Sequence, residues 1–377
     1  MTDPGSERRR GRDVHRLAQS RGALVAGYDL AMLDLDGVVY RGQEAIAGSP
    51  EAVARIKECG LHVAFVTNNA ARPPSAVGRH LRSLGIDAAD GDVVTSAQAA
   101  ARLVADRVPR GAKVLVVGGD GLRIALEEHG LLGVDSLAAG PEAVVQGFHP
   151  EVGWTVLAEA AYAVAAGLPW VASNMDRTIP TARGVAPGNG TLVAAVMATT
   201  EVRPVVAGKP EPALFDETLL RVGGSRPLVI GDRLDTDIAG ANRVSADSLL
   251  VLTGVTDLSA LAAAAPADRP TFVAADLDGL WAVHAPVVDD GEGVRCAGWR
   301  CVVENDRVTA RLSAGRPTDG GPVAATPVDA GPTALLRAAV SAAWARQDRP
   351  TATSTRPELE MSAVRGALDE IMEQHRS

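Results

Sequence analysis

Short apolar runs alternate with amphipathic stretches through the first three quarters of the chain. Residues 28–35 are apolar except for two aspartates and are followed by Asp-Gly, which predicts a buried strand of a parallel sheet and then a turn. Residues 49–60 begin with Ser-Pro and stop at Gly, so both ends of a helix are marked. A second apolar run follows at residues 61–66, and this order predicts a right-handed crossover between parallel strands.

The alternation restarts near residue 98, and the first pattern resumes at residue 205. Strand-like runs in the middle segment predict a second α/β domain; they lie at residues 113–117, 143–146 and 169–172. Further short strands follow at residues 227–230, 249–252 and 271–274. We therefore predict an α/β fold with a Rossmann-like parallel-sheet core, residues 22–97 and 206–285, that carries an inserted α/β domain, residues 98–205.

The two ends of the chain differ in character from this pattern. Residues 1–21 are polar and contain three consecutive arginines, which predicts a disordered tail rather than an export signal. Residues 286–377 predict a small appended α+β module of unknown role. Within it, residues 289–293 read as a linker, residues 299–312 as a hairpin around Asn305-Asp306, and helices are expected near residues 333–347 and 357–374.

The composition of the chain limits the kinds of partner that the protein is expected to bind. A net charge of −9 over 377 residues argues against nucleic acid or an acidic membrane surface, which would need a cationic face. No run approaches the roughly 18 apolar residues of a membrane span. Three cysteines without zinc-site spacing suit a reducing cytoplasm. An anionic substrate would therefore need a metal ion or locally placed cations.

Polar side chains follow the predicted strands at four separate places. They are the pair Asp34 and Asp36, the pair Thr67 and Asn68, Lys209, and the pair Asp232 and Asp237. Each has an ordinary structural interpretation, since Asp-Gly is a common turn, a threonine can cap a helix and a lysine can lie on the surface. The carboxyl ends of parallel strands meet at one edge of a sheet, however, so the four signals together predict one site.

In order and residue type these signals resemble the four motifs of the haloacid dehalogenase-like superfamily, across residues 30–240. The resemblance implies a Mg²⁺-dependent phosphatase with Asp34 as nucleophile and Asp36 as general acid and base. It also implies two sets of binding residues. Thr67, Asn68 and Lys209 bind the phosphate, while Asp34, Asp232 and the backbone carbonyl of Asp36 hold the metal, and Asp237 orients a metal-bound water.

The inserted domain resembles the large α/β cap of the p-nitrophenylphosphatase and phosphoglycolate phosphatase branch. The Gly-Val-Val-Tyr sequence at residues 37–40, Thr-Asn-Asn at 67–69 and residues 231–238 look like that branch's signatures. Loops at residues 172–176 and 187–191 resemble its cap loops and suggest substrate contacts from Asn174, Asp176 and Gly188. Phe148 and His149 are hypothesised to face the leaving group.

Within this branch, the chain is most similar to actinobacterial glycerol 3-phosphate phosphatases, which implies a small polyol phosphate as substrate. Phosphoglycolate, pyridoxal phosphate and sugar phosphates are the alternatives. An alternative of another class is a regulatory or binding protein with residues 286–377 as its interaction module. A homo-oligomer formed through the inserted domain is a further arrangement that the resemblance allows.

Overall fold

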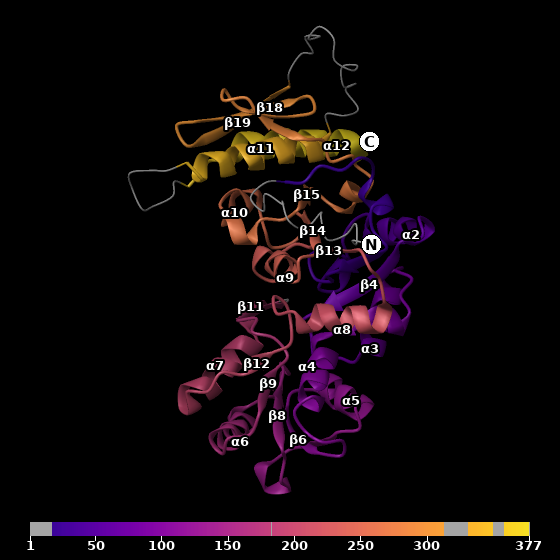
Figure 1. The fold of residues 1–377 in the computed structure, drawn as a ribbon, viewed down its shortest axis with the longest axis vertical. Coiled ribbons are helices and arrows are strands. Elements are labelled where there is room, and N and C mark those ends of the chain that lie inside the picture. The colour runs from indigo at the N-terminus through magenta and orange to yellow at the C-terminus, as the bar shows by residue number, and fades with distance from the viewer. Residues whose placement is uncertain (1–16, 182, 313–330, 350–357, 377) are drawn as a thin grey trace, which may run out of the picture. The chain divides into compact units, whose positions relative to one another are not determined.

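The computed structural model describes residues 17–181, 183–312, 331–349 and 358–376 (Figure 1). By its internal contacts the chain divides into two compact units, residues 29–227 and residues 1–28 with 228–377. Most of the predicted N-terminal tail, residues 1–16, lies outside the described residues. The predicted boundaries of the core, the inserted domain and the C-terminal module do not coincide with the boundaries of these two units. These boundaries stay a prediction.

The first unit contains a parallel sheet that begins with the apolar run identified above. Its strands β1 (Leu30–Leu33), β4 (His62–Thr67) and β5 (Val93–Thr95) pair in that order. All four residues of β1 are buried, as an uninterrupted apolar strand requires. Helices α2 (Ser49–Glu58) and α3 (Pro74–Ser83) each carry proline in the first turn. A short hairpin, β2 (Tyr40–Arg41) and β3 (Glu44–Ala45), turns at Gly42 with φ 64°.

The inserted domain is a second parallel sheet, with the strand order β12, β9, β8, β6, β7. These strands are β6 (Lys113–Val117), β7 (Leu132–Val134), β8 (Ala143–Gln146), β9 (Trp170–Ala172) and β12 (Val205–Val206). Figure 1 shows α6 (Trp154–Ala165) and α7 (Asn189–Thr200) on one side of them, with α4 (Ser96–Ala105) and α5 (Asp120–Glu128) on the other. A hairpin of β10 (Thr178–Thr181) and β11 (Gly184–Pro187) precedes α7, and α8 (Ala213–Val222) follows the sheet.

One strand lies in a different sheet from the one the sequence predicts. Val205 and Val206 were expected to resume the first pattern, but β12 pairs in parallel with β9 and completes the inserted sheet. Two consecutive valines predict a strand and carry no information about its neighbour. The return from the inserted sheet therefore comes after Val206.

The second unit also contains parallel strands. Strands were predicted at three places here, and β13 (Pro227–Gly231) pairs with β14 (Asp247–Val251), which pairs with β15 (Phe272–Ala274). Two short helices follow these strands, α9 (Ala239–Arg243) and α10 (Leu258–Ala262), and residues 234–238 form a single π-helical turn. The 3₁₀ turns of both units lie at Leu24–Ala26, Asp90–Asp92, Leu137–Ala139, Pro266–Asp268 and Leu277–Leu280.

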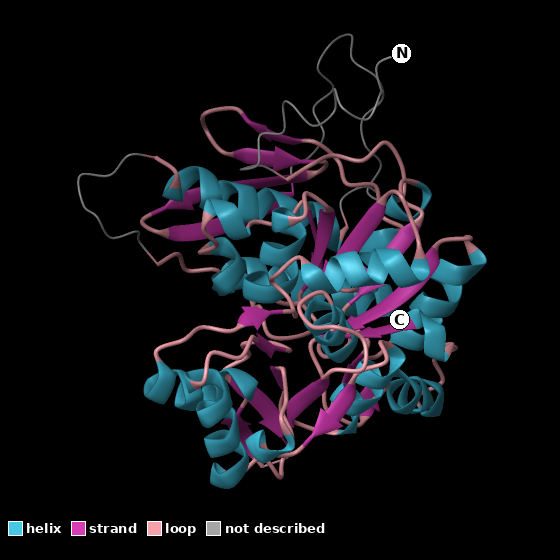
Figure 2. Ribbon diagram, turned by 60° about the horizontal axis from the view of Figure 1, so that its bottom comes forward, coloured by secondary structure: helices cyan, strands magenta, loops and turns pink. Residues whose placement is uncertain are grey.

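The C-terminal part of this unit is a four-stranded antiparallel sheet with two helices, α11 (Pro332–Gln347) and α12 (Ser362–Arg376) (Figure 2). Its strands are β16 (Val287–Asp289), β17 (Val294–Cys296), β18 (Trp299–Glu304) and β19 (Arg307–Leu312). The predicted hairpin is β18 and β19. The expected linker at residues 289–293 is instead the turn between β16 and β17, where the Asp290 N–H donates to the Gly293 carbonyl at 3.1 Å.

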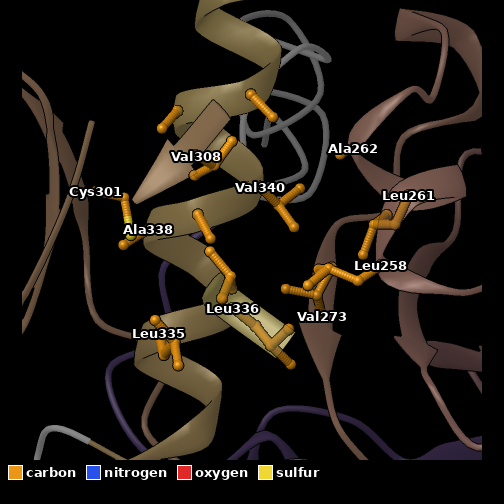
Figure 3. Packing of buried hydrophobic residues seen from close by; sticks show 14 of the residues in the cluster. Leu258, Leu261, Ala262, Val273, Cys301, Val308, Leu335, Leu336, Ala338 and Val340 are labelled. Atoms are coloured by element: carbon orange, nitrogen blue, oxygen red, sulfur yellow. The ribbon is translucent and has the colours of Figure 1, made fainter. Parts of the chain in front are cut away.

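The C-terminal elements share a hydrophobic core with the parallel strands of their unit. In Figure 3, Leu336 and Val340 of α11 face Val273 of β15 and Leu258 and Leu261 of α10. The Trp344 indole N–H donates to the carbonyl of Leu261 at 3.0 Å. Residues 286–312 and α11 are therefore packed into the unit and are not a free appendage.

Residues 17–21 of the predicted disordered tail are described in the structure, and one of them belongs to the same core. Leu17 is buried in this cluster, and the Ala18 N–H donates to the carbonyl of Thr271 at 2.9 Å. The Ser20 N–H donates to the carbonyl of His284 at 2.9 Å. This segment is therefore held to the unit by one buried apolar side chain and by backbone hydrogen bonds, neither of which a polar sequence predicts. In the described part of the chain no helix is long and apolar enough to cross a membrane.

Candidate active site

Asp34 and Lys209 form a buried ion pair in the first unit. Asp34 follows β1, and its Oδ1 lies 2.6 Å from Lys209 Nζ. The lysine also donates to the Val66 carbonyl at 3.1 Å, and its side chain is 4% exposed against 12% for Asp34. The solvated surface interpretation of Lys209 is therefore excluded. Since buried charges need a partner, the pair keeps a cation fixed beside the carboxylate that is predicted to be the nucleophile.

Asp36 lies two residues further on, in the turn after β1. Gly37 has φ 86° and donates its N–H to the Tyr40 carbonyl at 2.9 Å, so the Asp-Gly turn is present as well. Asp36 keeps solvent access, yet the surrounding protein displaces part of its water and raises the pKa of its carboxyl. Electrostatic interactions with Arg72, Lys209 and His80 lower that pKa and so oppose the effect of burial.

Arg72 was not among the residues predicted for the site. Its guanidinium hydrogen-bonds the Tyr40 hydroxyl and acts on the Asp36 carboxyl. Burial and the neighbouring carboxylates nonetheless raise the pKa of Tyr40, so this phenol stays protonated at neutral pH. The sequence signal that could have indicated Arg72 is its place in the loop after β4, five residues beyond Thr67.

Thr67 is the last residue of β4, and Asn68 follows it. The Thr67 hydroxyl oxygen accepts the Asn69 N–H at 3.1 Å, and the side chain is almost fully buried. Asn68 faces Lys209: its Oδ1 accepts the Lys209 N–H at 2.8 Å, and its Nδ2 donates to the Lys209 carbonyl at 3.0 Å. The structure therefore brings together four predicted residues of this unit, namely Asp34, Thr67, Asn68 and Lys209.

Two predicted residues of the inserted domain meet the same loop. Asn174 Nδ2 donates to the Asn68 carbonyl at 2.7 Å, and Asn68 Nδ2 donates to Asp176 Oδ2 at 3.2 Å. A Cβ on Gly188 would collide with the Asp176 carbonyl, so this glycine permits close approach of two loop backbones. Asn189, which was not predicted, supports the loop by donating from Nδ2 to the Asn174 carbonyl at 2.7 Å.

Phe148 and His149 lie in the loop after β8 and are half-buried. The His149 Nδ1 accepts the Glu151 N–H at 3.3 Å, and its ring lies against Gly119. The loop that contains Gly119 in turn meets the loop after β4, where the Gly121 N–H donates to the Ala71 carbonyl at 3.3 Å. These contacts hold loops together, and a role toward the leaving group stays a prediction.

Asp232 and Asp237 lie in the second unit, after β13. Both are buried; Asp232 Oδ2 accepts the Val255 N–H at 2.6 Å, and Asp237 Oδ2 accepts the Arg233 N–H at 3.2 Å. A Cβ on Gly254 would overlap the Asp232 carboxylate, and a Cβ on Gly231 would overlap the side chain of Asp237. Two glycines thus make room for two carboxylates that the turn after the strand would otherwise exclude.

The donor chemistry of these residues fits a magnesium ion. Asp34, Asp232 and Asp237 offer only carboxylate oxygens, the hard ligands that Mg²⁺ prefers. Buried carboxylates are costly unless a cation lies near them, and the space for Asp232 and Asp237 exists only because residues 231 and 254 are glycine.

Known proteins share both the motifs and the fold. The family model described as haloacid dehalogenase-like hydrolase matches residues 31–132, and a second model of such hydrolases matches residues 206–280. A D-glycerol 3-phosphate phosphatase from Mycobacterium tuberculosis is 46% identical over 253 residues, which cover 67% of this chain and 71% of that protein. The chain belongs to the haloacid dehalogenase-like hydrolases. The predicted family is thereby confirmed.

Solved structures agree with the predicted fold class and branch of this hydrolase. A glycerol phosphate phosphatase from Mycobacterium tuberculosis in complex with magnesium is 37% identical, covers 93% of this chain and 98% of its own, and gives a TM-score of 0.76. A p-nitrophenyl phosphatase from Archaeoglobus fulgidus is 31% identical, covers 67% of this chain and 98% of its own, and gives a TM-score of 0.63. The α/β fold with a parallel-sheet core and an inserted domain is confirmed.

Proposed function

We propose that this hydrolase is a Mg²⁺-dependent phosphomonoesterase that cleaves glycerol 3-phosphate to glycerol and phosphate through an aspartyl-phosphate. The observation that carries the proposal is the 2.6 Å contact of Lys209 Nζ with Asp34 Oδ1, in a chain 46% identical to a glycerol 3-phosphate phosphatase. A carboxylate can attack an anionic phosphate only where positive charge is supplied. The Lys209 ammonium group supplies part of this charge beside Asp34.

Asp34, Asp232 and the backbone carbonyl of Asp36 would hold Mg²⁺, and Asp237 would support it through water. When bound, the ion neutralises negative charge on the phosphate and stabilises the charge that develops in the transition state. The family assignment, the hard-oxygen donors and the glycines beside Asp232 and Asp237 support this part of the proposal.

In the first step an Asp34 oxygen attacks phosphorus, and the bond from phosphorus to the leaving oxygen breaks. Lys209, the Thr67 hydroxyl and the Asn68 N–H orient the phosphoryl oxygens. Asp36 donates a proton to the leaving oxygen, and it then accepts a proton from the water that hydrolyses the aspartyl-phosphate. The raised pKa of Asp36 supports this role, because it keeps a larger fraction of the carboxyl protonated as the pH rises.

The substrate is assigned from similarity rather than from a described contact with the leaving group. Two of the relatives named above, both from Mycobacterium tuberculosis, are glycerol phosphate phosphatases. The inserted domain brings Asn174 and Asp176 to the loop that carries Thr67 and Asn68. A lid of this kind excludes water and selects the leaving group. A small polyol phosphate is therefore the proposed substrate.

The test is phosphate release from glycerol 3-phosphate, phosphoglycolate, pyridoxal phosphate and sugar phosphates, with and without Mg²⁺. We expect glycerol 3-phosphate to give the highest kcat/KM and release to require the metal. Asp34→Asn should abolish turnover without loss of the folded circular dichroism spectrum. Asp120→Asn is the matched control, since Asp120 is an exposed aspartate that follows a parallel strand of the inserted sheet.

Unimpaired phosphate release by Asp34→Asn would refute the mechanism. Release from none of the substrates would refute the enzymatic proposal and favour a binding protein that uses the same fold.

A further inference from the structure

Asn68 occupies the centre of a hydrogen-bond network that joins three segments distant in sequence. Its carbonyl accepts Ser96 Oγ at 2.6 Å and Asn174 Nδ2 at 2.7 Å. Its side chain holds the Lys209 peptide on both sides, by accepting the N–H at 2.8 Å and donating to the carbonyl at 3.0 Å. The same Nδ2 donates to Asp176 Oδ2 at 3.2 Å.

The space around this side chain leaves little freedom for it to move. A Cβ on Gly208 would lie 2.5 Å from Asn68 Oδ1 and 2.5 Å from the Ser173 carbonyl, so the segment before Lys209 is pressed against both. The loop of Asp176 is held from its other side, where the Gly190 N–H donates to the Asp176 carbonyl at 2.9 Å. A shift of this loop must therefore be accommodated at Asn68.

We infer that Asn68 is a positioning residue whose side chain links the Asp176 loop of the inserted domain to the backbone of Lys209. The inference deepens the proposed function and rests on it, since it assigns the regulation of the same site. When the Asp176 loop lies against Asn68, the shared Nδ2 is oriented, and the amide keeps Lys209 in line with Asp34. When that contact is lost, the Asn68 side-chain amide is free to rotate, and its two hydrogen bonds to the Lys209 backbone are weakened.

The magnitude follows from the geometry that catalysis needs. Misplacement of a catalytic group by about 1 Å can lower the rate by about 100-fold. Asn68→Ala removes both bonds to the Lys209 peptide and should lower kcat by about that factor. Asp176→Ala leaves those bonds available but unsupported and should lower kcat by about tenfold, with a smaller effect once Asn68 is already alanine.

The first measurement does not depend on activity. Hydrogen exchange of the Lys209 amide, followed in the full-length protein without substrate, reports the bond to Asn68 Oδ1. Asn68→Ala and Asp176→Ala should both accelerate this exchange, the second through the Asn68 side chain that Asp176 contacts. Asn69→Ala is the matched control, because the neighbouring Asn69 accepts the Ala71 N–H at 2.9 Å and should leave exchange at Lys209 unchanged.

The second measurement is a double-mutant cycle on kcat with glycerol 3-phosphate. The expected result is that Asp176→Ala lowers kcat in the unaltered background and by less than twofold in Asn68→Ala. If Asn68→Ala does not fold, the reciprocal exchange Asn68→Asp with Asp176→Asn replaces it. That pair restores a donor opposite an acceptor and should exceed the kcat of Asn68→Asp alone by about tenfold.

Unchanged exchange at Lys209 in Asp176→Ala would overturn the inference, and so would effects on kcat that simply multiply. Failure of the unaltered protein to release phosphate from any substrate would instead overturn the proposed function. The exchange measurement would still decide whether Asn68 links the loop to Lys209.

Discussion

Acidification should destabilise the second unit through one buried histidine. His284 has no exposed surface. Its Nε2 lies 2.9 Å from the Gly279 carbonyl, which can only accept, so Nε2 carries the proton. Its Nδ1 faces Arg337 Nη1 at 3.4 Å, and the Phe272 ring meets the imidazole edge-to-face at 5.0 Å. Both ring nitrogens thus have the partners of a neutral imidazole.

Burial lowers the pKa of His284 from 6.5 to about 4; the Gly279 carbonyl opposes this shift, and the Arg337 charge adds to it. Below pH 6.5 the unfolded chain binds a proton that the folded protein binds only near pH 4. The contribution of His284 to stability is therefore constant above about pH 6.5 and falls as the pH falls through that window. At about 1.4 kcal/mol per pKa unit, the loss is about 3 kcal/mol at pH 4. Native proteins have free energies of unfolding of about 5–15 kcal/mol, so this is a large part of the total.

The assay is urea unfolding at pH 7 and pH 4, compared with His284→Gln. Glutamine can donate to the Gly279 carbonyl and accept from Arg337, and it does not titrate. The unaltered protein should lose about 3 kcal/mol more than this variant between the two pH values. His62→Gln is the control, because the His62 side chain is 49% exposed. Equal losses in the unaltered protein and His284→Gln, or an NMR titration of His284 near pH 6.5, would refute the reasoning.

Two further predictions concern the shared core and the lysine. Leu336→Ala should lower the free energy of unfolding by about 2–5 kcal/mol in urea titrations, because the Leu336 side chain is fully buried in the cluster of Figure 3. Leu312→Ala is the control; the Leu312 side chain is 60% exposed, so this variant should change the free energy of unfolding by under about 0.5 kcal/mol. Equal effects would contradict the packing described for α11. Lys209→Met should lower kcat for phosphate release by about 10²–10³-fold, and Lys57→Met, which removes a surface pair with Asp87, should leave it within twofold; comparable kinetics in both variants would contradict the role given to Lys209.

The sequence predicts those helices and strands that are marked by a local pattern, such as an apolar run or a turn pair, without reference to distant residues. Lys113–Val117 and Ala143–Gln146 are the strands that the apolar runs indicate, and the hairpin of β18 and β19 turns at Asn305-Asp306 as expected. The motifs after the strands could be placed for the same reason. A strand end is visible as the point where an apolar run meets a polar residue or glycine, and chemistry in parallel sheets gathers there.

The relations that were not predicted are long-range. Nothing in the sequence of α11 indicates that it packs on Val273, and nothing around Leu17 indicates that this residue joins the same cluster. The hydrogen bond of the Lys209 N–H to Asn68 joins residues 141 positions apart, and the Arg72 charge acts on Asp36 from a different loop. Such partners are chosen by tertiary packing, which a single sequence does not display.

The strand of two valines before Lys209 has a practical consequence for domain exchange. Because β12 hydrogen-bonds to β9, a chimaera that transplants residues 98–205 would cut through the last strand of the transplanted sheet and leave Val206 paired to a foreign neighbour. Lys209 lies only three residues beyond Val206. A junction placed after Val206 transfers the sheet whole and leaves Gly208 and Lys209 with the recipient, so grafts that swap leaving-group preference among these hydrolases should be cut there.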